Sequence, residues 1–264
     1  MRIVVLVKPV PDPAAGGERL GSDFRLDRAA TPAVVNANDE YALEAALKLV
    51  EQHGGEVTVL SMAGANAPET IRKALAMGAA GGIHVSDASL AGSDVVSTAR
   101  VLAGALKDVE ADLILAGADT SDGGAGVVPP GVATLLGLPY LSYAAKIEPD
   151  PGSGTVRVNR ISPTGYDVLE ASMPAFIACT QALGAPRYPS LKGIMAARSK
   201  TVEDRPLEAV RAAAGDGPLG GEAAATKVLA ASAPPPRAAT RVVRDAPDEA
   251  ARQVVAFLAE RRII

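Results

Sequence analysis

The start of the chain constrains the fold most, because it is an uninterrupted apolar run. Ile3 to Val7 are β-branched residues and a leucine, which is typical of a strand buried on both faces of a parallel sheet. Lys8-Pro9-Val10-Pro11-Asp12-Pro13 follows, and we expect it to end the strand because proline cannot donate to a neighbouring strand. The run is too short for a secretory signal and leads into a lysine, so the sequence predicts a first strand here.

Strand and helix patterns then alternate. Strands are predicted at 57–61, 83–85 and 113–116, separated by helical patterns at 39–52, 66–77 and 94–107, and a further helix ends near Leu136. This alternation indicates a parallel sheet covered on both faces. Beyond residue 139, turn sequences at 150–152 and 162–165 separate short strand candidates and indicate an antiparallel section. The expected fold class is α/β: a doubly wound, mostly parallel sheet with an added antiparallel section and a C-terminal extended arm.

Three local predictions concern smaller features. Asn38 is expected to cap the helix at 39–52, whose first turn then carries the acidic residues that a helix N-terminus favours. Asn66 is expected to cap the next helix, since Pro68 and Glu69 follow it at the usual positions. Residues 14–33 are expected to be loop or hairpin, with a short strand at 24–27.

Charge and residue types exclude several functions. The net charge is −4 and the basic residues are scattered, which argues against binding to nucleic acid. No apolar run approaches the ~18 residues of a membrane span, so we expect a cytoplasmic protein that is not membrane-embedded. His53, His84 and Cys179 form no metal-ligand or nucleophile pattern, and Cys179 is expected to be a buried small residue. These features predict no metal and no catalytic residue, and they favour a binding or carrier protein.

The C-terminal part changes in composition. Residues 211–241 are rich in Ala, Gly and Pro and cannot form much core. A last amphipathic helix is predicted over about 248–261, with Val254, Val255 and Leu258 on one side. We interpret this region as an arm that wraps a partner; the alternative is a flexible tail docked on its own domain.

A glycine-rich segment follows the predicted strand at 113–116. Gly117 to Pro130 leads into a helix, and glycine amides at a helix N-terminus suit a phosphate group. The alternative is a plain glycine-rich turn. The segments at 7–8, 36–39 and 61–64 also follow, or could follow, strand ends, where open parallel sheets bind ligands. Together they predict a nucleotide site, although Asn38 alone would be explained by helix capping.

Five stretches of the chain match motifs of one known family. They lie at 5–12, 35–46, 69–79, 117–139 and 186–197. The stretches at 69–79 and 186–197 are the most specific. On these residues the chain resembles the beta subunit of electron transfer flavoproteins over nearly its whole length, and its ending, Ile263-Ile264, is similar to actinobacterial relatives.

The resemblance implies a Rossmann-like core and a C-terminal arm that embraces an alpha subunit in a heterodimer. It implies that the pair accepts electrons from acyl-CoA and other dehydrogenases and passes them to a membrane quinone oxidoreductase. FAD would be held mainly by the alpha subunit at the interface, and this subunit would bury a structural AMP. A second FAD would replace AMP in electron-bifurcating relatives.

The resemblance also implies the binding residues. The cofactor-binding set is Val7, Asn36, Ala37, Asn38, Asp39, Met62, Asp122, Gly123, Gly124, Ala125, Gly126, Val127, Val128, Gly131, Val132 and Ala133. The backbone at 123–127 would hold phosphate, while Val7 and Met62 would line the adenine pocket. The partner-binding set is Tyr188, Leu191, Lys192, Ile194 and Met195. Leu191 would be the exposed anchor placed in a pocket on the dehydrogenase; the alternative is a buried structural leucine.

The implied organisation has three parts. Residues 1–185 would form the nucleotide-binding domain, 186–200 a partner recognition loop, and 201–264 the arm and helix that embrace the alpha subunit. The glycine-rich loop has fewer polar side chains than is usual in the family, so backbone contacts would hold the ligand. Ser162 to Tyr166 and Ala14 also depart from the family pattern. Two alternatives stay open: an electron-bifurcating subunit with a second FAD, and a stand-alone nucleotide-binding module.

Overall fold

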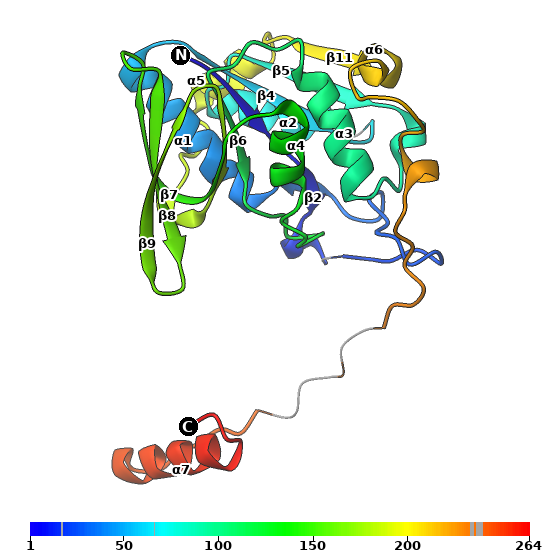
Figure 1. Ribbon diagram of the computed structural model, residues 1–264. Coiled ribbons are helices and arrows are strands. Elements are labelled where there is room, and N and C mark those ends of the chain that lie inside the picture. Colours follow the sequence, from blue (N-terminus) through cyan, green and yellow to red (C-terminus); the bar gives the residue numbers. More distant parts are fainter. Residues whose placement is uncertain (17, 66, 233–234, 236–239) are drawn as a thin grey trace. The chain divides into compact units, whose positions relative to one another are not determined.

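One large sheet organises the first part of the chain. A computed structural model describes residues 1–264 except 17, 66, 233–234 and 236–239. The strands of this sheet are β1 (Arg2–Leu6), β4 (Glu56–Met62), β5 (Gly81–Ser86), β6 (Leu113–Gly117), β7 (Tyr140–Asp150), β8 (Thr155–Ser162), β9 (Gly165–Ser172), β10 (Ala175–Cys179) and β11 (Val202–Pro206). Their order is β11-β5-β4-β1-β6-β10-β7-β8-β9, and the pairs from β11 to β7 are all parallel (Figure 1).

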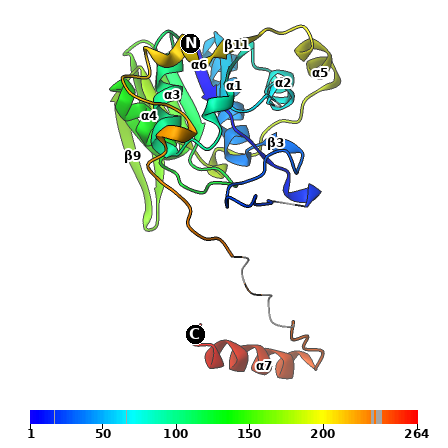
Figure 2. The same ribbon diagram turned by 90° about the vertical axis from the view of Figure 1, so that its right-hand side faces the viewer.

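Helices cover both faces of this sheet. α1 (Ala37–His53) and α2 (Pro68–Met77) bury Leu43 and Ile71 against one face, while α3 (Val95–Leu106), α4 (Val128–Leu136) and α6 (Leu207–Arg211) pack on the other. α5 (Leu191–Ala197) packs beside α2 (Figure 2). Short 3-10 helices lie at Pro13–Ala15, Ala88–Leu90, Gln181–Leu183 and Gly221–Ala223. The two covered faces confirm the Rossmann-like, doubly wound fold class.

The antiparallel section is present as expected. β7 pairs with β8 and β8 with β9, both antiparallel. Asp150 forms the first turn by accepting the amide of Gly152 at 2.9 Å, which is the usual role of aspartate at a turn start. Val156 and Val158 are fully buried on the inner face of this extension, so the alternation of β8 directs one face to the core.

Several local predictions were wrong. Residues 24–27 form no strand: Phe24 has a φ of 61°, and the only pairing described there is an isolated bridge between Leu20 and Leu26. A small sheet was missed, in which β2 (Pro9–Pro11) pairs antiparallel with β3 (Ala33–Val35). Proline is tolerated there because β2 is an edge strand of a two-stranded sheet.

The predicted helix caps also differ. α1 begins two residues earlier than expected, with Asn36 rather than Asn38 at its N-cap, because the side chain of Asn38 bonds outside the helix. Ala67 is the N-cap of α2, and Asn66, the predicted cap, lies outside the described residues.

After residue 200 the chain adds one more strand to the sheet, and only further on does it leave the α/β unit. β11 was not anticipated, yet it pairs parallel with β5 from Val202 to Pro206.

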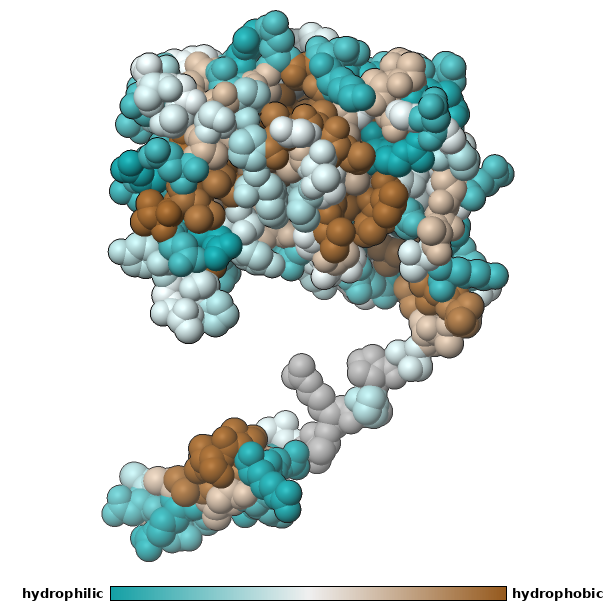
Figure 3. Space-filling view, in the orientation of Figure 1, coloured by the Kyte–Doolittle hydropathy of each residue, from teal (hydrophilic) through white to brown (hydrophobic). Residues whose placement is uncertain are grey.

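The chain divides into a compact unit of residues 1–229 and a second unit of residues 230–264. The second unit contains α7 (Pro247–Glu260), close to the predicted helix, and one side of α7 is apolar (Figure 3). Among the described residues, no helix has the length and apolar character needed to cross a membrane.

Candidate functional site

The strand order reverses at β1 in the α/β unit. From β1 the chain passes through α1 to β4 on one side, whereas β6 lies on the other side of β1. In open parallel sheets such a reversal separates the loops beyond the carboxyl ends of the two central strands, and ligands bind there. We call the residues around the ends of β1 and β6 the strand-end crevice: Val7, Lys8, residues 36–39 and residues 117–128.

Asp39 joins the two strand ends. Its carboxylate accepts the amide of Lys8, just after β1, at 2.8 Å and the amide of Gly117, at the end of β6, at 3.0 Å. An added Cβ on Gly117 would lie 2.5 Å from Oδ1 of Asp39, so only glycine admits this contact. Burial raises the pKa of Asp39 to about 7, although the hydrogen bonds from both amides and the charge of Lys8 oppose the increase.

Two asparagines hold the glycine-rich loop against α1. The amide group of Asn36 donates to the carbonyl of Asp119 at 2.9 Å, and its oxygen accepts the amide of Ser121 at 3.2 Å. Asn38 donates to the carboxylate of Asp119 at 2.6 Å. The first turn of α1 therefore fixes the loop after β6.

A carboxylate held by two cations lies at the same place. The side chain of Asp122 is almost fully buried and contacts Lys8 Nζ at 2.8 Å and Arg28 Nη2 at 2.7 Å. Burial alone would raise the pKa of Asp122, but the hydrogen bonds and charge of Lys8, with those of Arg28, lower it to about 2. Sequence reasoning missed Arg28, because it lies in the irregular segment at 14–33 and no motif marks it.

The loop between Asp122 and α4 is open. Gly124 and Gly126 have φ values of +55° and +61°, and an added Cβ on Gly124 meets no described heavy atom within 4 Å. Val127, directly before α4, is 51% exposed. Residues 123–127 therefore form a largely exposed, glycine-rich segment directly before α4, although the amide of Gly124 already donates to the carbonyl of Thr120 at 2.7 Å.

The other predicted cofactor-binding residues lie deeper. Val7, Val132 and Ala133 are buried in the core, whereas Met62 is partly buried at the end of β4. Beside Met62, Oγ of Ser61 is buried and has no hydrogen-bond partner among the described residues.

The predicted partner-binding residues gather on and before α5. Tyr188 is 93% exposed and Leu191 is 76% exposed. Ile194 and Met195 are also exposed, as is Lys192. The alternative that Leu191 is a buried structural residue is therefore wrong.

The two histidines and the cysteine belong to helices and strands of the α/β unit. Cys179 is fully buried, and burial raises the pKa of its thiol. His53 is the last residue of α1, as expected. His84 is buried in β5 and contacts Asp204 and the carbonyl of Ala63 at 3.2 Å each. In the described part of the chain, no group of His, Cys, Asp or Glu side chains could hold a metal ion.

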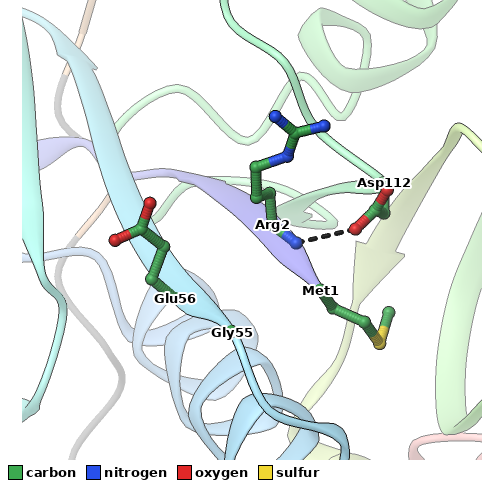
Figure 4. Close-up of a pocket in the computed structure, with 5 residues that line it drawn as sticks. All are labelled: Met1, Arg2, Gly55, Glu56 and Asp112. Carbon is green, nitrogen blue, oxygen red and sulfur yellow. Dashed lines mark hydrogen bonds between the residues drawn. The ribbon is translucent and has the colours of Figure 1, made fainter.

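A hollow lies at the opposite end of the sheet. It has a volume of about 410 Å³ and is lined by Met1, Arg2, Gly55, Glu56 and Asp112, at and just before the first residues of β1, β4 and β6 (Figure 4). The amide of Arg2 donates to Asp112 at 2.7 Å. The hollow contains none of the predicted site residues, and ligands of open α/β sheets bind at the carboxyl ends instead.

The fold and the crevice together define a doubly wound, Rossmann-like α/β protein with a glycine-rich loop at its switch point. Residues 23–210 match the electron transfer flavoprotein domain. The chain is 38% identical to electron transfer flavoprotein subunit beta of Mycobacterium tuberculosis (strain ATCC 25618 / H37Rv), over 99% of both chains. It is 33% identical to the same subunit of Thermoanaerobacterium thermosaccharolyticum over 100% of both chains, and 37% identical to Protein FixA of Azorhizobium caulinodans over 76% of this chain and 74% of that one.

The chain therefore belongs to the electron transfer flavoprotein family, as a beta subunit. This membership confirms the resemblance described above. It makes the chain an electron carrier in flavin-associated transfer, and a beta subunit implies a companion alpha subunit.

Proposed function

We propose that the strand-end crevice binds AMP as a structural ligand, while FAD is held mainly by the alpha subunit at the interface between the two chains. The observation that carries this proposal is the open glycine backbone at 123–127, which lies at the N-terminus of α4 beside Lys8 and Arg28. Exposed amides, a helix N-terminus and cations are the groups that recognise phosphate.

The charges of the crevice support binding of a phosphate group. Asp122 is an anion, but Lys8 and Arg28 both contact it, so these three side chains together carry a net positive charge; the carboxylate of Asp119, which accepts from Asn38, adds a negative charge to the crevice. The pKa of Asp39 is about 7, which leaves this carboxyl partly protonated at neutral pH and reduces its repulsion of a phosphate.

The other predicted residues have supporting roles in this proposal. The backbone amides of the segment 123–128 hold the phosphate, apart from that of Gly124, which donates to Thr120, and Asn36 to Asp39 keep the loop in place. Met62 and the main chain at Val7 line the adenine, and the unpartnered hydroxyl of Ser61 offers a hydrogen bond nearby. Val132 and Ala133 place α4 through core packing, and Gly131 lies close to Ala99 of α3. FAD, when bound, supplies the redox chemistry, and this chain supplies binding and orientation.

Electrons reach the pair from acyl-CoA and other dehydrogenases and pass on to a quinone oxidoreductase at the membrane. The pair itself is located in the cytoplasm. Residues 186–200 form the recognition loop for the dehydrogenase, with Leu191 as its anchor. Exposed apolar side chains at Tyr188, Leu191 and Met195 support this role, because interface anchors are large apolar groups placed in pockets. Within the predicted arm at 201–264, residues 202–211 join the sheet unit as β11 and α6, so it is the separate unit at 230–264 that embraces the alpha subunit; its amphipathic α7 supports this role.

Analysis of the purified heterodimer tests the proposal. The chain would be co-expressed with its alpha subunit, the flavin measured by absorbance, and the released nucleotides separated by chromatography. We expect one FAD and one AMP per heterodimer. Two FAD would support electron bifurcation instead. An empty crevice, or a dehydrogenase substrate in it, would overturn the proposal.

A further inference from the structure

The recognition loop presents apolar side chains outward, so its own hydrophobic burial cannot fix its position. Tyr188, Leu191 and Met195 are each more than 60% exposed, and Ile194 is 46% exposed. The one buried residue of α5 is Ala197. A short helix with so little buried area needs other contacts to stay in one place.

The entry of the loop is fixed by one arginine. Arg187 Nε donates to Glu44 Oε2 at 2.7 Å and its backbone amide donates to the same oxygen at 3.1 Å. Its Nη2 donates to Glu44 Oε1 at 3.2 Å and to Glu51 Oε2 at 3.0 Å, and Nη1 also bonds to Glu51. Both glutamates lie on α1. A planar guanidinium held by two carboxylates has a defined orientation, unlike a single surface ion pair.

The surroundings of Arg187 strengthen this clamp. The side chain of Glu44 is only 6% exposed, whereas that of Glu51 is 57% exposed. Burial would raise the pKa of Glu44, but Arg187 outweighs it and lowers the pKa. Pro186 and Pro189 flank the arginine and Tyr188; because proline restricts its own backbone and the residue before it, the clamp sets the direction of a stiff segment.

The far end of the loop is fixed independently. Lys200 Nζ donates to the carbonyls of Leu75 and Ala79, at 2.9 and 2.7 Å, at the C-terminus of α2. A lysine ammonium is favourable at a helix C-terminus. The loop is thus tied to α1 at its start and to α2 at its end, and its apolar residues lie between the two ties.

We propose that Arg187 is a positioning residue for partner docking: its clamp on Glu44 and Glu51 holds the recognition loop so that Leu191 and its neighbours point outward. This inference rests on the proposed docking role of residues 186–200. Arg187 acts through the loop rather than by touching the dehydrogenase, because its guanidinium faces α1.

The test uses the complete heterodimer and an acyl-CoA dehydrogenase of the source organism, with the flavoprotein as electron acceptor. Arg187→Gln should raise the KM for the flavoprotein by roughly tenfold and leave kcat and the flavin content unchanged. Arg187→Lys, which keeps one ion pair and loses the planar fork, should give an intermediate KM. Arg157→Gln is the matched control, because it removes an exposed ion pair with Glu170 between β8 and β9, and it should leave KM unchanged.

Two further measurements separate positioning from direct contact. Glu51→Gln and Glu44→Gln should also raise KM, and each should be non-additive with Arg187→Gln, because all three remove the same clamp. Backbone amides at 188–197 should exchange hydrogen faster in Arg187→Gln. An additive double variant, or unchanged exchange, overturns the inference.

Leu191→Ala distinguishes this inference from the proposed function. If Leu191→Ala raises KM but Arg187→Gln does not, the positioning role is wrong and the docking role stands. If Leu191→Ala leaves KM unchanged, the docking role itself is wrong, and the inference fails with it.

Discussion

The carboxylate of Asp39 accepts the amide of Gly117 at 3.0 Å, which joins the first turn of α1 to the end of β6. Because the same carboxylate also accepts the amide of Lys8, one side chain connects the ends of both central strands. It does so while 5% exposed, so the width of the strand-end crevice depends on a buried acid.

Replacement of this acid should change how stability depends on pH. The pKa of Asp39 is about 7 in the folded chain and about 3.9 in an unfolded chain. The stability that protonated Asp39 contributes is therefore complete below about pH 4 and is lost as pH rises to about 7. Asp39→Asn removes this dependence, and its amide group opposes one of the two backbone amides, at a cost of about 1–3 kcal/mol.

We therefore expect the stability of the natural chain relative to that of Asp39→Asn to fall steadily between pH 4.5 and pH 8. Urea unfolding of the full chain at several pH values measures this difference. A difference that grows with pH, or stays constant, would show that Asp39 is ionised throughout.

The cation cluster should matter for both stability and ligand content. Lys8→Met leaves Asp122 buried with Arg28 alone, so we expect a loss of about 1–3 kcal/mol in the free energy of unfolding. The AMP content of the purified heterodimer should also decrease. Arg2→Met is the control: it removes an exposed ion pair with Glu110, which should change stability by less than about 1 kcal/mol. Equal effects of the two substitutions would contradict a role for Lys8 in the crevice.

The backbone of the glycine-rich loop can be tested with a matched pair of substitutions. Gly124 and Gly154 have φ values of +55° and +70°, and neither added Cβ meets a described atom within 4 Å. Alanine at either position should cost about 1–2 kcal/mol through backbone strain alone. Gly124→Ala should also lower the AMP content, whereas Gly154→Ala, in the turn between β7 and β8, should not. If both variants retain AMP equally, the conformation at Gly124 is not needed for binding.

Cys179 should behave as a core residue. It is fully buried at the end of β10, and burial raises the pKa of its thiol, so the reactive thiolate is disfavoured. We expect iodoacetamide to leave Cys179 unmodified in the native chain and to modify it fully in urea, as followed by mass spectrometry. Rapid modification of the native chain would show that β10 opens locally.

The sequence predicts the sheet well where apolar runs are long. The apolar run at 3–7 and the alternation of strand and helix patterns through residue 136 indicate a parallel sheet. Strands of such a sheet are buried on both faces, so their sequences are apolar throughout. β11 escaped prediction, since Val202-Glu203-Asp204-Arg205-Pro206 is largely polar. β11 pairs at the edge of the sheet, where backbone hydrogen bonds determine the pairing. A polar edge strand therefore lacks the apolar pattern from which strands are predicted.

The candidate site is predictable in part for the same reason. Gly117 to Pro130 is recognisable because glycines stand between a strand and a helix. Arg28 is not recognisable as a site residue from the sequence. It lies in an irregular segment and contacts Asp122, which is 94 positions away. Asn38 was expected to cap a helix and instead reaches Asp119, because a polar group on the first turn can bond across to a loop as readily as to its own helix.

The return of the chain to β5 has a practical consequence for engineering. Residues 202–206 cover the backbone of β5 from Gly82 to Ser86, so a chain truncated after Lys200 would expose a strand with free amides and carbonyls. Exposed edges of this kind recruit strands from other molecules. Shortened versions of this subunit should therefore end after residue 229, where the first compact unit is complete.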